Sequence, residues 1–246
     1  MAVRARQGRL LTGPRILVVT AVAAEAAAVL RGLPDAPSVL TLPGGWKLER
    51  SGPLDVLTAG VGPAAAAAAT ATALTAARQP YTLALSVGIA GGFPGVAPVG
   101  GVVVADAIVA ADLGATTPDG FADVTELGFG RVLHPTTGAP DAAAAIRAAG
   151  LDCAVGPVLT VSTVTGTAER AAELARRHPG AAAEAMEGFG VAEAAHAFGV
   201  PVLELRGVSN AVGPRDRAAW RIGDALHALT GAAAAVAAMP WSRLVP

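Results

Sequence analysis

The chain has 246 residues, of which 53% are hydrophobic and 15% are charged, and its formal net charge is -1. This length suits one large α/β domain or two small ones. The near-neutral charge, without a long basic run, excludes an electrostatic nucleic-acid interface. The single cysteine, Cys153, excludes an internal disulfide and a cysteine-rich metal site. Its neighbours Asp152 and Ala154 are not electropositive, so we interpret it as an inert thiol.

The N-terminal segment has two possible interpretations. Arginines precede the first apolar run, an outline close to that of a signal peptide. However, Gly13-Pro14 interrupts the approach, and Glu25 stands where the apolar region would continue. We therefore expect a disordered basic tail over 1–13 and one domain over 14–246. No apolar run reaches the ~20 residues of a membrane span, so we expect a cytoplasmic protein without a membrane partner.

Strand and helix patterns alternate along the chain. Continuous apolar runs predict strands that are covered on both faces, and alanine-rich stretches predict helices. The expected strands cover 15–20, 38–42, 46–50, 54–59, 82–88, 101–111, 155–162 and 201–209. The expected helices cover 23–31, 63–78, 141–149, 167–178, 187–198 and 217–238, and 112–140 is expected to be a long loop. The alternation, without a linker, predicts a single-domain α/β fold with a mixed, mostly parallel central sheet flanked by helices.

Two glycine-rich stretches follow predicted strands. Gly60-Val61-Gly62 opens a helix and fits part of a dinucleotide fingerprint. The acidic residue that this fingerprint requires about 20 positions later is missing, so we favour a tight turn at the edge of a pocket. A dinucleotide-dependent oxidoreductase remains the competing class. The second stretch, 88–92, can be an ordinary turn or can let the backbone approach a flat ligand.

Metal-binding patterns are weak in this sequence. The four histidines, at 134, 178, 196 and 227, share no metal-ligand spacing. The acidic loop residues between 112 and 126 are scattered, and such carboxylates are usually solvated. We therefore predict no metal site.

Two carboxylates, Glu25 and Glu187, stand at strand-to-helix junctions in nearly apolar sequence. Polar side chains persist in such surroundings mainly when they are paired or used. The alternatives are a solvated helix face for Glu25 and a charge that favours the helix start for Glu187. Together they predict a site at the ends of the strands.

Five short segments occur in the order that is typical of the purine nucleoside phosphorylase and nucleosidase family. They are Thr20-Ala21-Val22-Ala23-Ala24-Glu25, Ala59-Gly60-Val61-Gly62, Ser86-Val87-Gly88-Ile89-Ala90-Gly91-Gly92, Ala185-Met186-Glu187-Gly188 and Arg206-Gly207-Val208-Ser209-Asn210. The chain resembles this family over most of its length. The resemblance implies a nucleoside phosphorylase-like fold, a small-molecule nucleoside substrate, no cofactor and a homo-oligomer.

Within that family, segments 161–167, 184–192 and 206–216 resemble the futalosine hydrolases of menaquinone biosynthesis, which release hypoxanthine and dehypoxanthine futalosine. The alternative is another purine nucleosidase or phosphorylase, such as the methylthioadenosine/S-adenosylhomocysteine type. That nucleosidase has aspartate where Asn210 stands, which favours hypoxanthine over adenine here. Segments 16–30 and 79–100 lack arginine, which favours water over phosphate as the nucleophile.

The resemblance also implies roles for individual residues. Glu25 orients and activates water, Glu187 grips the ribose hydroxyls with Met186 packed on the sugar, and Asn210 faces the base. Further substrate contacts are expected from Ala90, Gly91, Ser162, Val164, Phe189, Ser209 and Arg206. Arg215 and Asp216 receive no role.

Overall fold

A computed structural model describes residues 14–240 of the protein. The expected tail over 1–13 and the residues after Pro240 lie outside the described part. The strands are β1 (Ile16–Thr20), β2 (Ser38–Thr41), β3 (Lys47–Ser51), β4 (Leu54–Thr58), β5 (Leu83–Gly92), β6 (Val102–Ala110), β7 (Gly114–Thr117), β8 (Gly120–Asp123), β9 (Leu133–Pro135), β10 (Cys153–Thr160), β11 (Ala183–Ala185) and β12 (Val202–Ala211). The helices are α1 (Ala23–Arg31), α2 (Pro63–Ala76), α3 (Ala139–Ala148), α4 (Ala168–Arg177), α5 (Gly188–Ala197) and α6 (Ile222–Ala237).

The main sheet has ten strands in the order β11-β10-β6-β12-β5-β1-β4-β3-β2, with β9 paired to β6. Strands β4, β1, β5 and β12 run parallel, as do β6, β10 and β11. The two groups meet in antiparallel pairs, β12 with β6 and β11 with β5. Because β11 pairs with both β10 and β5, five strands close into a ring. The expected single α/β fold with a mixed central sheet is confirmed.

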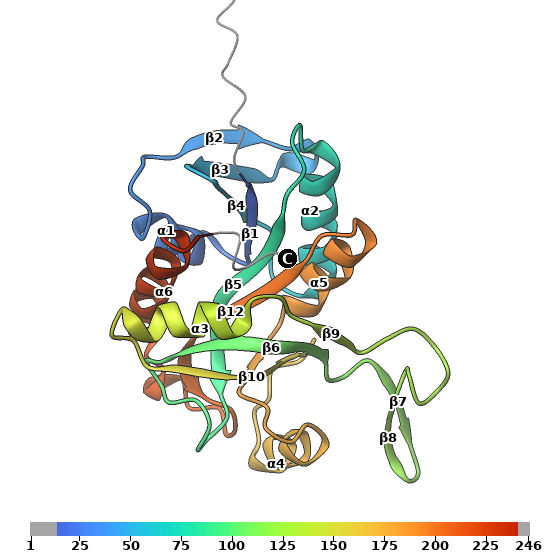
Figure 1. Ribbon diagram of the computed structural model, residues 1–246. Helices are drawn as coiled ribbons and strands as arrows, with labels where there is room; N and C mark the ends of the chain where they lie inside the picture. The colour runs from blue at the N-terminus through green and yellow to red at the C-terminus, as the bar shows by residue number, and fades with distance from the viewer. Residues whose placement is uncertain (1–13, 241–246) are drawn as a thin grey trace, which may run out of the picture.

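Helices cover the sheet on two sides (Figure 1). Helices α1, α3 and α6 pack on one side, and α2 and α5 pack on the other. Alternate residues of β1 serve both layers, since side chains alternate along a strand. Ile16 belongs to the core under α1, α3 and α6, while Leu17 belongs to the core under α2 and α5. The continuous apolar run of β1 thus reflects burial on both faces.

Helices α2 and α5 approach each other closely where Gly190 meets the backbone of Pro63. A Cβ atom added to Gly190 would lie 2.0 Å from the carbonyl oxygen of Pro63. Since the α5 backbone passes this close to the start of α2, the first turns of the two helices are fixed against each other. This contact holds the N-terminal end of α5, where Glu187 stands.

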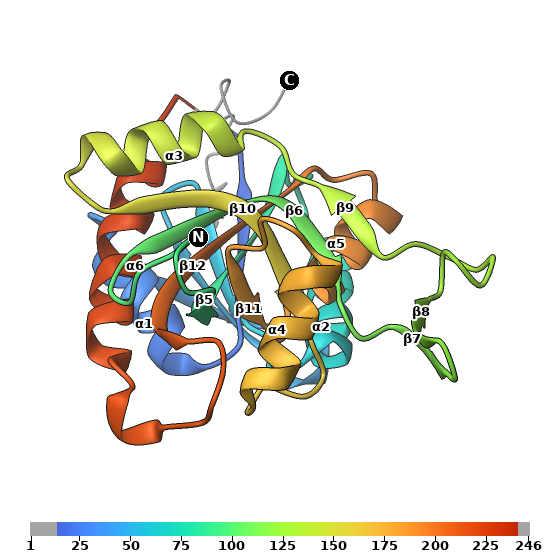
Figure 2. The same cartoon turned by 90° about the horizontal axis from the view of Figure 1, so that it is seen from below.

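The expected loop over 112–140 was wrong in part. It contains the β7–β8 hairpin and strand β9, and α3 begins at Ala139. The hairpin projects away from the main sheet (Figures 1 and 2) and pairs only within itself. It has no buried face, so its sequence carries no hydrophobic alternation. Within residues 14–240, no helix is long and apolar enough to cross a membrane.

A buried ionic cluster lies at the N-terminal ends of β1, β4 and β5. The Asp55 carboxylate is fully buried and forms an ion pair with Arg15. It also accepts hydrogen bonds from Arg50 Nε at 2.8 Å and from the Tyr81 hydroxyl at 2.7 Å. Burial alone would raise the pKa of Asp55, but these donors outweigh it and lower the pKa below its ordinary value.

Candidate active site

A cavity of about 280 Å³ opens at the carboxyl ends of β1, β5 and β12. This is the edge where ligands bind in open α/β sheets, and the volume is near the lower end of the range for small-molecule sites. The lining comes from stretches that lie far apart in the sequence. Its residues are Ala21, Val22, Glu25, Val61, Ile89, Ala90, Gly91, Val164, Thr165, Glu184, Ala185, Met186, Glu187, Ser209, Asn210, Val212, Arg215 and Trp220.

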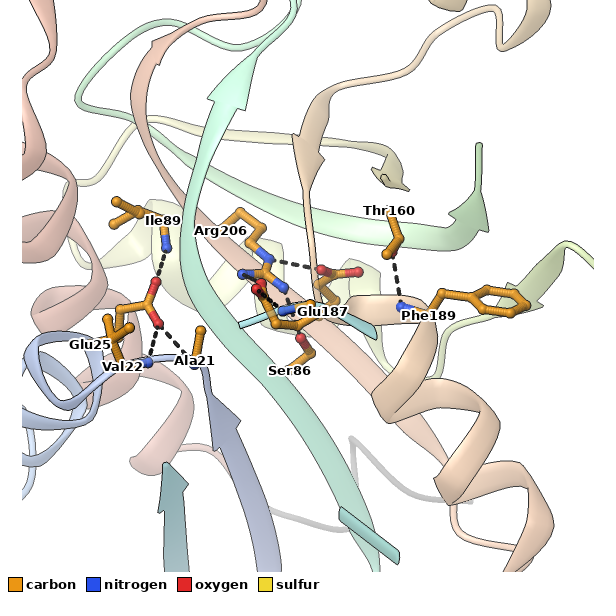
Figure 3. A network of polar contacts seen from close by, with 11 residues as sticks. Ala21, Val22, Glu25, Ser86, Ile89, Thr160, Glu187, Phe189 and Arg206 are labelled. Atoms are coloured by element: carbon orange, nitrogen blue, oxygen red, sulfur yellow. Dashed lines mark hydrogen bonds and ion pairs between the residues drawn. The ribbon is translucent and has the colours of Figure 1, made fainter. Parts of the chain in front are cut away.

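Glu25 lies in the first turn of α1, directly after β1, and only 4% of it is exposed. One carboxylate oxygen accepts the Ile89 N–H at 2.9 Å, and the other accepts the N–H groups of Ala21 at 2.9 Å and Val22 at 3.2 Å (Figure 3). Burial raises the pKa of Glu25, although Arg206 and the backbone donors oppose this effect. The expected alternative of a solvated helix face is therefore wrong.

Glu187 directly precedes α5, without a capping bond from its side chain, and is joined to a buried ionic network (Figure 3). One of its carboxylate oxygens accepts the Gly62 N–H at 3.1 Å, and the other lies 3.4 Å from Arg206 Nη1. Arg206 also donates to Glu204 at 2.7 Å and to the Ser86 hydroxyl at 3.0 Å. Burial lowers the pKa of Arg206, but the surrounding carboxylates outweigh it and raise that pKa. Glu187 is therefore held by a permanent positive charge.

Gly88 lets the two halves of this site approach each other. A Cβ atom at this position would lie 2.4 Å from Arg206 Nη1 and 2.7 Å from Glu25 Oε1. Any side chain at this position would thus separate the Glu25 carboxylate from the Arg206 guanidinium. Gly91 and Gly92, which lie beyond the expected strand over 82–88, are also part of β5.

Asn210 reaches the cavity through a bulge in β12. Val208 pairs with Ala90 and Asn210 pairs with Gly91, so Ser209 is the extra residue. Bulges of this kind redirect a side chain beside a site. The amide oxygen of Asn210 accepts from the Ser209 hydroxyl at 2.8 Å, and its nitrogen donates to the Ala211 carbonyl at 2.9 Å. One N–H and one oxygen lone pair remain for a ligand.

A third carboxylate, Glu184, lines the cavity from β11, and 5% of it is exposed. Its two oxygens accept the Thr165 N–H, at 2.8 Å, and the Thr165 hydroxyl. Burial raises the pKa of Glu184, while both Thr165 bonds act in the opposite direction. Sequence reasoning assigned no role to this residue.

Comparison with known proteins shows to which family the chain belongs. A model of the phosphorylase superfamily matches residues 15–240. The futalosine hydrolase of Streptomyces coelicolor is 61% identical over 88% of this chain and 92% of its own. The chain belongs to the futalosine hydrolase family.

Other comparisons agree with this futalosine hydrolase family assignment. The futalosine hydrolase of Acidothermus cellulolyticus is 50% identical over 90% of each chain. The fold matches a 5'-methylthioadenosine/S-adenosylhomocysteine nucleosidase from Neisseria meningitidis with a TM-score of 0.78, covering 92% of this chain and 100% of that one, at 19% identity. The resemblance inferred from the sequence is thus confirmed.

The cavity brings together most of the residues that the sequence singled out. Those that line it are Glu25, Ala90, Gly91, Val164, Met186, Glu187, Ser209 and Asn210. The other three candidates do not line it. Arg206 is 1% exposed and acts on the cavity through its ion pair with Glu187 and through its charge near Glu25. Phe189 is buried against His134, and Ser162 is an exposed residue whose N–H donates to Asp112.

The other motifs have structural explanations. The N–H of Gly62 donates to Glu187 and is therefore not free for a pyrophosphate. His134 bonds to Glu193 at 2.8 Å. Across residues 14–240, no group of three histidine, cysteine or acidic residues is arranged to hold a metal. Arg215 and Trp220 also line the cavity, and the Arg215 guanidinium lies 5.1 Å from the Trp220 ring centre.

Proposed function

We propose that this protein hydrolyses the N-glycosidic bond of futalosine, releasing hypoxanthine and dehypoxanthine futalosine in menaquinone biosynthesis. One observation carries the proposal. Glu25, Glu187 and Asn210, whose types fit the three tasks of such a reaction, line one cavity in a member of the futalosine hydrolase family. In the reaction, the bond between C1' of the sugar and N9 of the base breaks, and water oxygen bonds to C1'.

The Glu25 carboxylate is the proposed base for the attacking water. Three backbone N–H groups hold its orientation, and Oε1, which accepts only the Ile89 N–H, keeps a lone pair for the water. Its raised pKa makes it a better proton acceptor than an exposed glutamate. The water gives one proton to Glu25 as its oxygen bonds to C1'.

The proposed task of Glu187 is to hold the ribose hydroxyls. A carboxylate bonded to a hydroxyl next to C1' interacts more strongly as positive charge develops on the sugar, so it favours the transition state over the substrate. The bonds from Gly62 and Arg206 fix its position before substrate arrives. Met186, which lines the same wall, provides an apolar surface for the ring.

Asn210 is the proposed partner of the leaving base. The base leaves with the electron pair of the broken bond and must take up a proton or share its charge. The free N–H of Asn210 can donate to O6 of hypoxanthine, and the amide oxygen can accept from N7 once that nitrogen is protonated. An amide supplies no titratable proton, so the proton on N7 comes from solvent.

Water, rather than phosphate, is the proposed nucleophile. Arg206, which lies 3.4 Å from Glu187, is already paired with two carboxylates and buried. The test is to incubate purified protein with futalosine, with and without phosphate, and to measure free base by chromatography. Hypoxanthine release that needs no phosphate supports the proposal. Release that requires phosphate would indicate a phosphorylase, and no release would reject the substrate.

The homo-oligomer and the cytoplasmic location expected from the sequence belong to this proposal too. Large apolar side chains are exposed on the segment around the β7–β8 hairpin, including Phe129 at 70% and Leu133 at 50%. A segment that exposes several large apolar side chains is a candidate contact surface between copies of the chain. Sedimentation measurements test the first proposal, and cell fractionation tests the second.

A further inference from the structure

The sheet places two polar side chains on either side of one glycine. Gly91 of β5 pairs with Glu184 of β11 in an antiparallel bridge and with Asn210 of β12 in a parallel one. Residues paired across neighbouring strands point to the same face of a sheet, and all three line the cavity. With strands about 4.8 Å apart, the Cα atoms of Glu184 and Asn210 are separated by roughly two strand spacings. A Cβ atom at Gly91 would lie 3.0 Å from Val212 Cγ2 and 3.2 Å from Asn210 Nδ2, so the glycine leaves room for these two neighbours.

When ionised, Glu184 can only accept hydrogen bonds at this position. An ionised carboxylate accepts hydrogen bonds at about four lone-pair positions and donates none. Thr165 fills one position on each oxygen through its N–H and its hydroxyl. Burial raises the pKa of Glu184, while these two donors favour the ionised form. In the ionised form the remaining positions can only accept. A ligand group that meets Glu184 must therefore carry a hydrogen.

Purine bases differ in the hydrogen-bonding groups at N1 and at position 6. A 6-oxopurine has an N–H at N1 and acceptors at O6 and N7, whereas a 6-aminopurine has a bare acceptor nitrogen at N1. Glu184 and Asn210 lie on opposite sides of Gly91 in one cavity, so a base whose O6 and N7 meet Asn210 can turn its N1 edge toward Glu184. The oxo base then gives Glu184 a donor, while the amino base places a lone pair against a buried negative charge, which is unfavourable.

We propose that Glu184, held by Thr165, is a specificity-determining residue that accepts the N1 hydrogen of a 6-oxopurine and rejects 6-aminopurines. The inference rests on the proposed function for the identity of the full substrate but not for the base. A site built around a buried hydrogen-bonding group discriminates strongly against analogues that lack the matching hydrogen. Asn210 alone cannot do this, since an amide also pairs with adenine.

The first test compares futalosine with its 6-amino analogue. The unaltered protein is expected to prefer futalosine by at least ~10²-fold in kcat/KM. In Glu184→Gln the ratio of the two kcat/KM values is expected to fall by about 10²-fold, because the new amide can donate to a bare N1. Both substrates are measured on the same sample, so the folded fraction cancels from the ratio. A ratio unchanged in Glu184→Gln would overturn the proposal.

The second test does not depend on catalysis and so separates this inference from the proposed function. Calorimetry with free hypoxanthine and free adenine is expected to show tighter hypoxanthine binding by the unaltered protein. Glu184→Gln is expected to weaken hypoxanthine binding by ~10–100-fold, as for a lost charged hydrogen bond. Glu169→Gln, an exposed change on α4, is the matched control and should alter neither base. Equal affinities for the two bases in the unaltered protein would overturn the proposal, whether or not futalosine is cleaved.

A probe of the base itself covers the case in which Glu184→Gln does not fold. 1-Methylhypoxanthine carries a methyl group in place of the N1 hydrogen. The unaltered protein is expected to bind it at least ~10-fold more weakly than hypoxanthine. Equal binding of the two bases would contradict a contact between Glu184 and N1.

Discussion

At the residue scale, the site depends on a few buried side chains with fixed hydrogen-bond partners. A substitution of Asn210 tests the part of the cavity that is proposed to bind the base. Asn210→Ala removes the free N–H and the free lone pair, and we expect turnover of futalosine to fall by ~10²-fold or more. Steady-state kinetics measure this loss. Near-normal kcat/KM would remove Asn210 from the base site.

A substitution of Glu25 tests the part of the cavity that is proposed to hold the attacking water. Glu25→Gln keeps the size of the side chain but loses the proton acceptor, so turnover is expected to fall by at least ~10²–10⁴-fold. Substrate binding, measured by calorimetry, is expected to persist. Unchanged turnover in this variant would exclude Glu25 as the base.

The same residue predicts a pH dependence in the unaltered protein. Glu25 must be ionised to accept a proton, and its pKa is raised above the ordinary value of 4.5. We therefore expect kcat/KM to fall as the pH decreases, with a midpoint above 4.5. A pH profile of kcat/KM from pH 4 to 8 measures it, and an acidic limb that begins below that value would disagree.

The sequence allowed some of these residues to be predicted and concealed others. Glu25 and Glu187 were visible because each is a charge at a strand-to-helix junction in apolar sequence. Glu184 was not, because β11 is three residues long and too short to show an alternating pattern. Arg206 was expected to touch substrate, but it faces Glu204 and Ser86 inside the protein. The sequence of a strand does not show whether a polar side chain reaches the cavity or only contacts another side chain that does.

At the element scale, the packing of α2 on α5 positions Glu187. Gly190→Ala places a Cβ atom 2.0 Å from a backbone oxygen that cannot move aside easily. We expect the free energy of unfolding to fall by about 2 kcal/mol or more, as measured by urea denaturation. Gly223→Ala in α6 is the control, since its Cβ would meet nothing within 4 Å. A loss no larger than that of the control would show that the helices can move apart.

The ionic cluster at β4 makes a separate prediction about stability. Asp55→Asn leaves Arg15 and Arg50 without their buried partner, and we expect a loss of about 3–5 kcal/mol at pH 7. Because the folded pKa of Asp55 is lowered, its contribution is complete above the ordinary value of 3.8 and is lost as the pH falls through the folded value. Urea denaturation at several pH values measures this difference.

The control for this prediction is Asp119→Asn, an exposed change that should stay within about 0.5 kcal/mol of the unaltered protein. A difference between Asp55→Asn and the unaltered protein that grows on acidification would contradict the lowered pKa.

Most elements were predictable because their burial left a pattern. Strands such as β1 and β5 carry continuous apolar runs, and α2 is an alanine-rich stretch that begins with proline. The β7–β8 hairpin and β11 left none, because the first is exposed and the second is short. The extension of β5 to Gly92 was missed because glycines usually end strands, whereas here they admit close neighbours.

At the scale of the whole molecule, the assembly is the main expectation that sequence and fold leave open. We expect a sedimentation coefficient larger than that of a single 24.1 kDa chain. If the exposed cluster near the β7–β8 hairpin forms the contact, Phe129→Glu is expected to shift the protein toward the monomer, since a charge replaces a large apolar side chain. A monomer at all concentrations would contradict the expected homo-oligomer.

The ring of β5, β12, β6, β10 and β11 has a consequence for how substrate enters and products leave. Strand β11 has hydrogen-bonded neighbours on both sides, so it cannot swing out without breaking two ladders at once. We therefore expect the strands around the base site to stay in place. Substrate and products must then pass between the loops that contain Val164 and Trp220. In hydrogen–deuterium exchange, the amides of β11 should be protected far longer than a three-residue strand at a sheet edge, while those loops exchange early.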